Sequence, residues 1–195
     1  MSFFSDLWDE IVALFSPTPA ASPVVTCATC GTLTPAQAQQ WFDHFKSRTD
    51  IPWNYPNDCC YNRAEVMDQE LKGAGVNAGK AWNYAPDRAH LLRVDTPNDP
   101  AGYVEWGYHV APTVPVMVNG VATPMVLDPS IASGPITPQQ WKDMQSQPGS
   151  QLVQTDATPY YREPNGTVHL PPGPAQIDQV FKDHRAARVD NWAGH

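Results

Sequence analysis

The sequence predicts an α+β domain in which helices come first and a series of short antiparallel strands follows. Residues 34–72 carry apolar side chains at helical spacing, whereas residues 80–128 are divided into short apolar runs by Gly, Pro, Asn and Asp. Proline accounts for 21 of the 195 residues, about twice its usual ~5% share. This much proline argues against a helical bundle and favours a mixed fold that is rich in loops.

Charge and hydropathy exclude two classes of protein. The chain has 12 Lys+Arg and 20 Asp+Glu, a net charge of −8, and nucleic acids are bound through Lys and Arg that neutralise phosphates. No stretch approaches the ~18 consecutive apolar residues of a membrane-spanning helix. We therefore expect neither a nucleic-acid partner nor a membrane span.

The first 23 residues predict an appendage to a domain that covers residues 24–195. Residues 1–15 place apolar side chains at the spacing of an amphipathic helix, with acidic residues between them, and residues 16–23 form a proline-rich linker. The segment lacks the basic start and the small-residue cleavage site of a secretory signal. We expect it to dock on its own domain or on a partner protein.

Two helices open the predicted domain. Thr34, followed by a proline, suits the N-cap of the first helix, which extends to about Ser47. Its inward-facing residues are expected to be Trp41, Phe42 and Phe45. The second helix covers residues 59–72, with Asn57 or Asp58 as its cap and two glycines at its end.

The remaining elements are mostly short strands separated by turn residues. The expected strands are residues 80–84, 91–95, 103–110, 114–119 and 125–128. Two further helices, at residues 137–145 and 175–188, and a strand near residues 151–154 complete the chain. Helices followed by a run of strands define the α+β class.

Four cysteines, Cys27, Cys30, Cys59 and Cys60, raise the question of a metal site or a disulfide. The first two have the spacing of half a zinc site, but the other two are adjacent, which a tetrahedral site rarely accommodates. We therefore expect no metal. In an oxidising compartment, Cys27 and Cys30 are expected to pair with each other, or one of them with Cys59, and the sequence leaves this pairing open.

Three residues, Cys60, His109 and Asp128, form a candidate catalytic group. Cys60 lies in the first turn of a predicted helix, where backbone N–H groups and the helix dipole stabilise a thiolate and can bind a developing oxyanion. Strict alternation would place His109 on the polar side of its strand, with Trp106 and Tyr108 on the other side. Asp128 ends an apolar run, and its carboxylate can hold the imidazole of a neighbouring strand.

The residues alone leave alternatives open. Cys59 competes with Cys60 for the role of nucleophile, and the geometry of a helix start does not separate them. His90 is a second candidate base among the six histidines. A helix-terminal cysteine, a strand histidine and an aspartate before proline also occur for purely structural reasons.

Three motifs occur in order between residues 58 and 141. They are DCCYNRAEVM (residues 58–67), WGYHVAPTV (106–114) and VLDPS (126–130), with Trp141 beyond them. Together they resemble the bacterial protein-glutaminases, and Lys80-x-Trp82 matches a strand of that family. In the family the nucleophile precedes Tyr-x-Arg-Ala, so the resemblance selects Cys60 over Cys59.

The resemblance implies a papain-like or transglutaminase-like fold, with the nucleophile at the N-terminus of a helix packed on an antiparallel sheet. It assigns Cys60, His109 and Asp128 to a triad that deamidates glutamine side chains in intact proteins, with no cofactor and no metal. The substrate is then a protein with an exposed glutamine. Trp106 and Tyr108, beside the histidine, are candidates for contacting it.

Several alternatives use the same residues. The thioester intermediate supports transglutamination if an amine takes the place of water, and the same triad can cleave a backbone amide, as in a papain-like peptidase or a cell-wall amidase. A non-enzymatic alternative is a partner-binding module built on the acidic helix and the proline-rich loops.

The chemistry also predicts a cellular setting. An unregulated protein deamidase would damage the cytoplasm of the cell that makes it. We therefore expect a bacterial effector or toxin, secreted without a signal peptide, rather than a cytoplasmic enzyme. An effector implies an immunity or chaperone protein as its partner.

Overall fold

A computed structural model of the chain describes residues 31–53, 59–96 and 99–192, with side chains up to residue 186. The predicted helix at residues 1–15, the linker after it, the predicted domain start and the cysteines at 27 and 30 lie outside the described residues. Among the described helices, none combines the length and the hydropathy that crossing a membrane requires.

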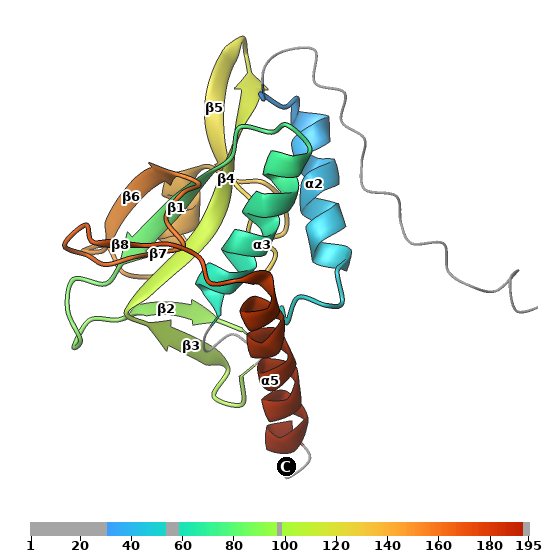
Figure 1. Cartoon of the computed structure of the whole chain (residues 1–195). Coiled ribbons are helices and arrows are strands. Elements are labelled where there is room, and N and C mark those ends of the chain that lie inside the picture. Colours follow the sequence, from blue (N-terminus) through green and yellow to red (C-terminus); the bar gives the residue numbers. More distant parts are fainter. Residues whose placement is uncertain (1–30, 54–58, 97–98, 193–195) are drawn as a thin grey trace, which may run out of the picture.

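An antiparallel sheet with the strand order β5–β4–β1–β6 forms the centre of the molecule (Figure 1). Its strands are β1 (Gly79–Tyr84), β4 (Tyr108–Val118), β5 (Val121–Val126) and β6 (Gln151–Asp156). Two small hairpins accompany it, β2 (Leu92–Asp95) with β3 (Tyr103–Trp106) and β7 (Tyr161–Arg162) with β8 (Val168–His169). The antiparallel strands confirm the predicted α+β class.

The described helices are α2 (Pro35–Ser47), α3 (Cys60–Gly73), α4 (Pro138–Asp143) and α5 (Pro174–Trp192). Thr34 and Thr137 cap α2 and α4, and each forms a capping box with the glutamine three residues later. The three aromatic side chains predicted to face inward from α2 are fully buried. Sequence therefore predicts the starts of α2 and α4 well, because these starts have a local chemical signal.

The two faces of the sheet pack against different helices. Val114 and Val116 of β4 join buried side chains of α2, α3 and α5. In Figure 1, α2 and α3 lie side by side and α5 extends below them. On the other face, Ala81 and Ala111 pack against Trp141 of α4. Alternating residues of one strand thus reach helices on both sides of the sheet.

The predicted division into strands is wrong between residues 103 and 119. The break falls at Gly107, which separates β3 from β4, and β4 then continues through Pro112 and Pro115. Proline lacks an N–H donor but keeps its carbonyl. The carbonyl of Pro112 accepts from the N–H of Leu127 at 3.0 Å, and that of Pro115 from the N–H of Leu33 at 2.8 Å. The two short hairpin strands β7 and β8 were not predicted.

A buried charge cluster attaches α3 to the sheet. Lys80 of β1 is fully buried, and its Nζ donates to Glu65 Oε2 at 2.8 Å and to the carbonyl of Pro159 at 2.7 Å. Asp68 Oδ2 lies 3.2 Å from the same Nζ. One cation thus faces two carboxylates. Burial raises the pKa of Asp68 to about 8, against the opposing effect of Lys80, so Asp68 is the carboxylate that keeps a proton.

We expect Asp68→Asn to change how stability depends on pH. The pKa of Asp68 is raised from 3.8 to about 8 in the folded state. Between these values the folded chain holds a proton that the unfolded chain has released, so wild-type stability falls as pH rises toward 8. The free energy of unfolding, measured in urea at about pH 5 and pH 8, should fall less between these two values in Asp68→Asn than in wild type.

Asp178→Asn, which changes an exposed carboxyl on α5, is the control and should keep the wild-type dependence. An equal loss in wild type and in Asp68→Asn would mean that Asp68 is ionised in the fold.

Candidate active site

Helix α3 begins with Cys60, and the residue before it forms the turn. Cys59 has a φ of 79°, in the left-handed region, and its side chain makes no capping hydrogen bond. The predicted cap by Asn57 or Asp58 is therefore wrong, because Cys59 occupies the N-cap position. The first backbone N–H groups of a helix have no partner within the helix. Cys60 is the first residue of α3, so its thiol belongs to this end of the helix.

The two neighbouring cysteines face different surroundings. Cys59 is fully buried in the core shared by α2, α3 and α5, and its Sγ accepts a hydrogen bond from Asn62 Nδ2 at 3.6 Å. Cys60 is 8% exposed and packs with Trp82 and Val110. The structure brings the thiol of Cys60 to the imidazole of His109, and the left-handed turn at Cys59 is what separates the two side chains.

The imidazole of His109 lies between Cys60 and Asp128. It is buried, and its Nε2 donates to Asp128 Oδ2 at 2.8 Å. Because Asp128 takes Nε2, the thiol is on the side of Nδ1, a buried nitrogen without another hydrogen-bond partner in the described part of the chain. The three residues therefore stand in the order Cys60, His109, Asp128, as the sequence predicts.

Two tryptophans enclose the imidazole. The ring of Trp106 stacks on His109 with 4.6 Å between centroids, and Trp141 stacks on it at 5.4 Å. The predicted strict alternation from residue 104 to 110 is wrong here, because the break at Gly107 brings Trp106 and His109 together. Aromatic faces attract a cation. The sandwich thus fixes the ring plane and favours the imidazolium.

The carboxylate of Asp128 accepts hydrogen bonds at both oxygens. Oδ2 accepts from His109 and from Trp141 Nε1, each at 2.8 Å. Oδ1 accepts from the backbone N–H of Ser130 at 3.1 Å and from the Ser130 hydroxyl. Asp128 is buried, and a buried carboxylate is stable only when its oxygens are satisfied. These donors hold it ionised and in a fixed orientation.

The electrostatics favour an ion pair between His109 and Asp128. Burial alone would lower the pKa of His109, but the charge and hydrogen bond of Asp128, with a contribution from Cys60, raise it to about 9. Burial would raise the pKa of Asp128, but His109, Ser130 and Trp141 lower it to about 2. At neutral pH the site therefore holds an imidazolium beside Cys60.

The other predicted residues occupy distinct places. Trp106 is 9% exposed and stacks on His109. Tyr108 is half-buried, with its ring near those of Tyr84 and Tyr161. The second candidate base, His90, is exposed and bonds to Asp87. The structure does not bring His90 to the site. Among the described residues there is no group of His, Cys, Asp or Glu that could hold a metal ion.

Two residues of the site have roles that residue patterns did not reveal. Trp141 connects α4 to Asp128 through its indole N–H, and Ser130 closes a turn on the same carboxylate. The Asp-Pro-Ser sequence is a signal for such a turn, since a serine two residues after an aspartate can donate back to it. The contact of Trp141 depends on tertiary packing and has no local signal.

Comparisons with known proteins show which family and which solved structures the chain is similar to. A family model described as glutaminase matches residues 38–145. Among solved structures, a crystal structure of protein-glutaminase is 26% identical with a TM-score of 0.66, covering 79% of this chain and 89% of that one. The NMR structure of protein-glutaminase from Chryseobacterium proteolyticum is 26% identical with a TM-score of 0.65, covering 77% and 86%.

A crystal structure of pro-protein-glutaminase is 25% identical with a TM-score of 0.66, and the match covers 80% of this chain and 59% of that chain. No curated protein sequence matches. The similarity confirms the predicted mixed fold, in which helices pack on a curled antiparallel sheet.

We expect Trp141→Phe to destabilise the fold through Asp128. The substitution keeps an aromatic ring against His109 but removes the donor to Oδ2. A hydrogen bond to a charged group contributes about 1.5–3 kcal/mol. Trp41→Phe is a matched control, because its fully buried indole N–H has no hydrogen-bond partner in the described part of the chain.

Urea unfolding should show that Trp141→Phe lowers the free energy of unfolding by at least about 1.5 kcal/mol more than Trp41→Phe does. Equal losses in the two variants would mean that the indole donor contributes only volume.

Proposed function

The chain belongs to the glutaminase family, and from this premise we propose that it deamidates protein glutamine through a triad of Cys60, His109 and Asp128. Membership of the family makes it a protein-glutamine deamidase rather than a non-enzymatic binding module. The observation that carries the triad is that the side chains of Cys60 and Asp128 both contact the buried imidazole of His109.

The first half of the reaction forms a thioester. His109 holds the proton that Cys60 has lost, and the thiolate attacks the carbon of the glutamine carboxamide. Backbone N–H groups at the start of α3, including that of Cys60, hold the oxyanion. The imidazolium then gives its proton to the departing nitrogen, the C–N bond breaks, and ammonia leaves.

The second half returns the enzyme to its starting state. His109 takes a proton from water, whose oxygen attacks the thioester carbon. The C–S bond breaks, glutamate is released, and the proton taken from water stays on His109 beside the Cys60 thiolate. Asp128 keeps the imidazole in one orientation throughout and stabilises its charged form. Hydrolysis, rather than transfer to an amine, is supported by the name that the similar structures share.

The proposed setting is that of an exported bacterial effector with a neutralising immunity or chaperone partner. What supports it is the chemistry, because a deamidase that accepts intact proteins would modify the proteins of its own cell. A pull-down from the producing bacterium, with and without residues 1–23, tests this. A partner that also abolishes deamidation supports the proposal, and normal growth of cells that express the active enzyme alone contradicts it.

We expect Cys60→Ala to abolish ammonia release from casein and from a blocked glutaminyl peptide, because no nucleophile remains. Cys59→Ala is the matched control and should keep turnover, since its thiol lies in the core. The mass of the treated casein, read in the same tubes, should rise as amides become carboxyls. Turnover that survives Cys60→Ala and disappears in Cys59→Ala would overturn the triad, and cross-linked casein would indicate transglutamination.

We expect the rate to fall at alkaline pH as the imidazolium is lost. The pKa of His109 is raised to about 9, chiefly by Asp128 acting against burial. Below this value the ring can protonate the leaving nitrogen, and above it the ring cannot. Asp128→Asn removes the carboxylate charge, so the alkaline limb of kcat/KM should move to lower pH. A limb that stays in place would show that Asp128 does not set the protonation of His109.

A further inference from the structure

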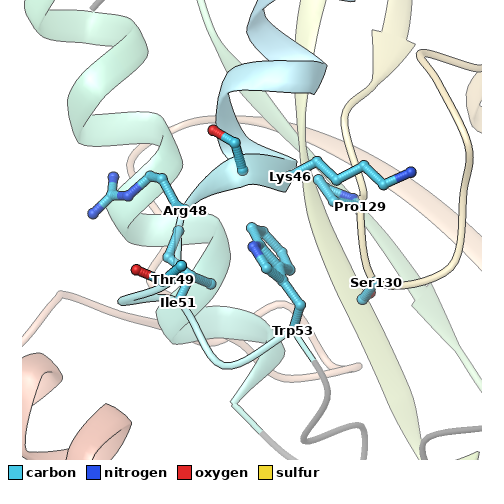
Figure 2. Close-up of a pocket in the computed structure, with 8 residues that line it drawn as sticks. Lys46, Arg48, Thr49, Ile51, Trp53, Pro129 and Ser130 are labelled. Atoms are coloured by element: carbon cyan, nitrogen blue, oxygen red, sulfur yellow. The ribbon is translucent and has the colours of Figure 1, made fainter. Parts of the chain in front are cut away.

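A hollow of about 450 Å³ lies beside the Asp128 end of the triad. One wall is the end of α2 with the segment that follows it, and the other is the turn after Asp128. Figure 2 shows the indole of Trp53 between these two walls, with Lys46 extending toward Pro129. The lining residues are Lys46, Ser47, Arg48, Thr49, Ile51, Trp53, Pro129 and Ser130.

The hollow shares a residue with the catalytic machinery. Ser130 lines it, and the backbone N–H and hydroxyl of Ser130 both donate to Asp128. The opposite wall belongs to the segment that precedes Cys60 in the chain. A group bound in the hollow would therefore lie next to the triad. The function proposed above leaves the hollow unused.

The charge of the hollow contrasts with that of the chain. The protein carries a net charge of −8, yet the charged residues of the lining are Lys46 and Arg48, and none of the lining residues is acidic. Arg48 is bound by Asp50 and Glu70. Lys46 is exposed at the rim of the hollow. The Ser47 hydroxyl donates to the carbonyl of His44 and the Ser130 hydroxyl to Asp128, so the hydroxyl of Thr49 is the one that adds a donor for a carboxylate.

The floor of the hollow is apolar and held in place. Trp53 is half-buried, and its Nε1 donates to the carbonyl of Phe45 at 3.0 Å, which fixes the indole. Ile51 and Pro129 complete the apolar surface. An apolar floor with a cationic rim suits a carboxylate on a short aliphatic stem, as in aspartate or glutamate.

We propose that this hollow is a substrate subsite that binds an acidic side chain adjacent to the reactive glutamine. The inference rests on the proposed function, which it deepens by naming a preference among protein substrates. Lys46 attracts the carboxylate, the hydroxyl of Thr49 donates to it, and Trp53 contacts its stem. The enzyme thereby prefers glutamines in acidic segments, although its overall charge would repel them.

Three blocked peptides test the preference. Each contains one glutamine, and the residues on both sides of it are Glu, Ala or Lys. We expect the wild-type enzyme to have a lower KM for the Glu peptide than for the Ala peptide. In Lys46→Glu the ratio of the two KM values should change by at least about fivefold in favour of the Ala peptide, because an attraction becomes a repulsion. Raising the salt concentration should reduce this change.

Lys182→Glu makes the same charge change on the exposed surface of α5, away from the residues that line the hollow. It should leave the KM ratio as in wild type. The subsite is refuted if Lys46→Glu shifts the KM of both peptides equally, or if Lys182→Glu shifts the ratio as much.

Ammonia release from the Ala peptide tests the proposed function separately from the proposed subsite. If the wild type deamidates the Ala peptide and Cys60→Ala does not, the proposed function holds whatever the ratio shows. If the wild type releases no ammonia from any of the three peptides, this result refutes the proposed function itself.

Discussion

The buried ion pair between His109 and Asp128 is the interaction on which the rest of the site depends. Placing two charges in a protein interior is costly unless every remaining donor and acceptor is matched. Here the matching groups come from several elements. Ser130 lies two residues after the aspartate, Trp141 comes from α4, and Trp106 comes from the hairpin before β4. The sheet and the helices on both of its faces are needed to assemble them.

A second buried charge cluster holds the helix of the proposed nucleophile, Cys60, against the sheet. Lys80 on β1 binds Glu65 and Asp68 on α3, the helix that begins with Cys60. Losing one partner of a buried ion pair costs about 3–5 kcal/mol. The Cys60 helix therefore has little freedom to move along the sheet, and His109 on the neighbouring strand β4 meets the thiol at a fixed position. Two buried ion pairs on adjacent strands thus set the geometry of a three-residue site.

Sequence predicted what has a local cause and missed what depends on packing. The capped starts of α2 and α4 and the turn residues between strands act within a few residues, so their positions follow from the sequence. The candidate catalytic residues became specific only through ordered motifs, because helix geometry did not separate Cys59 from Cys60. The left-handed turn at Cys59 separates them in the structure. The break at Gly107 and the contact of Trp141 with Asp128 arise from tertiary packing, so alternation along one strand gave the wrong neighbours for His109.

The central claim is that the imidazolium of His109 makes Cys60 a nucleophile. The most direct test is the rate at which iodoacetamide alkylates Cys60 at about pH 6, mapped by peptide mass in wild type and in His109→Ala. The account predicts rapid labelling of Cys60 in wild type and labelling at least about tenfold slower in the variant, as for a thiol that has lost its cationic neighbour. Equal rates in the two proteins would contradict it, because Cys60 would then react without help from His109.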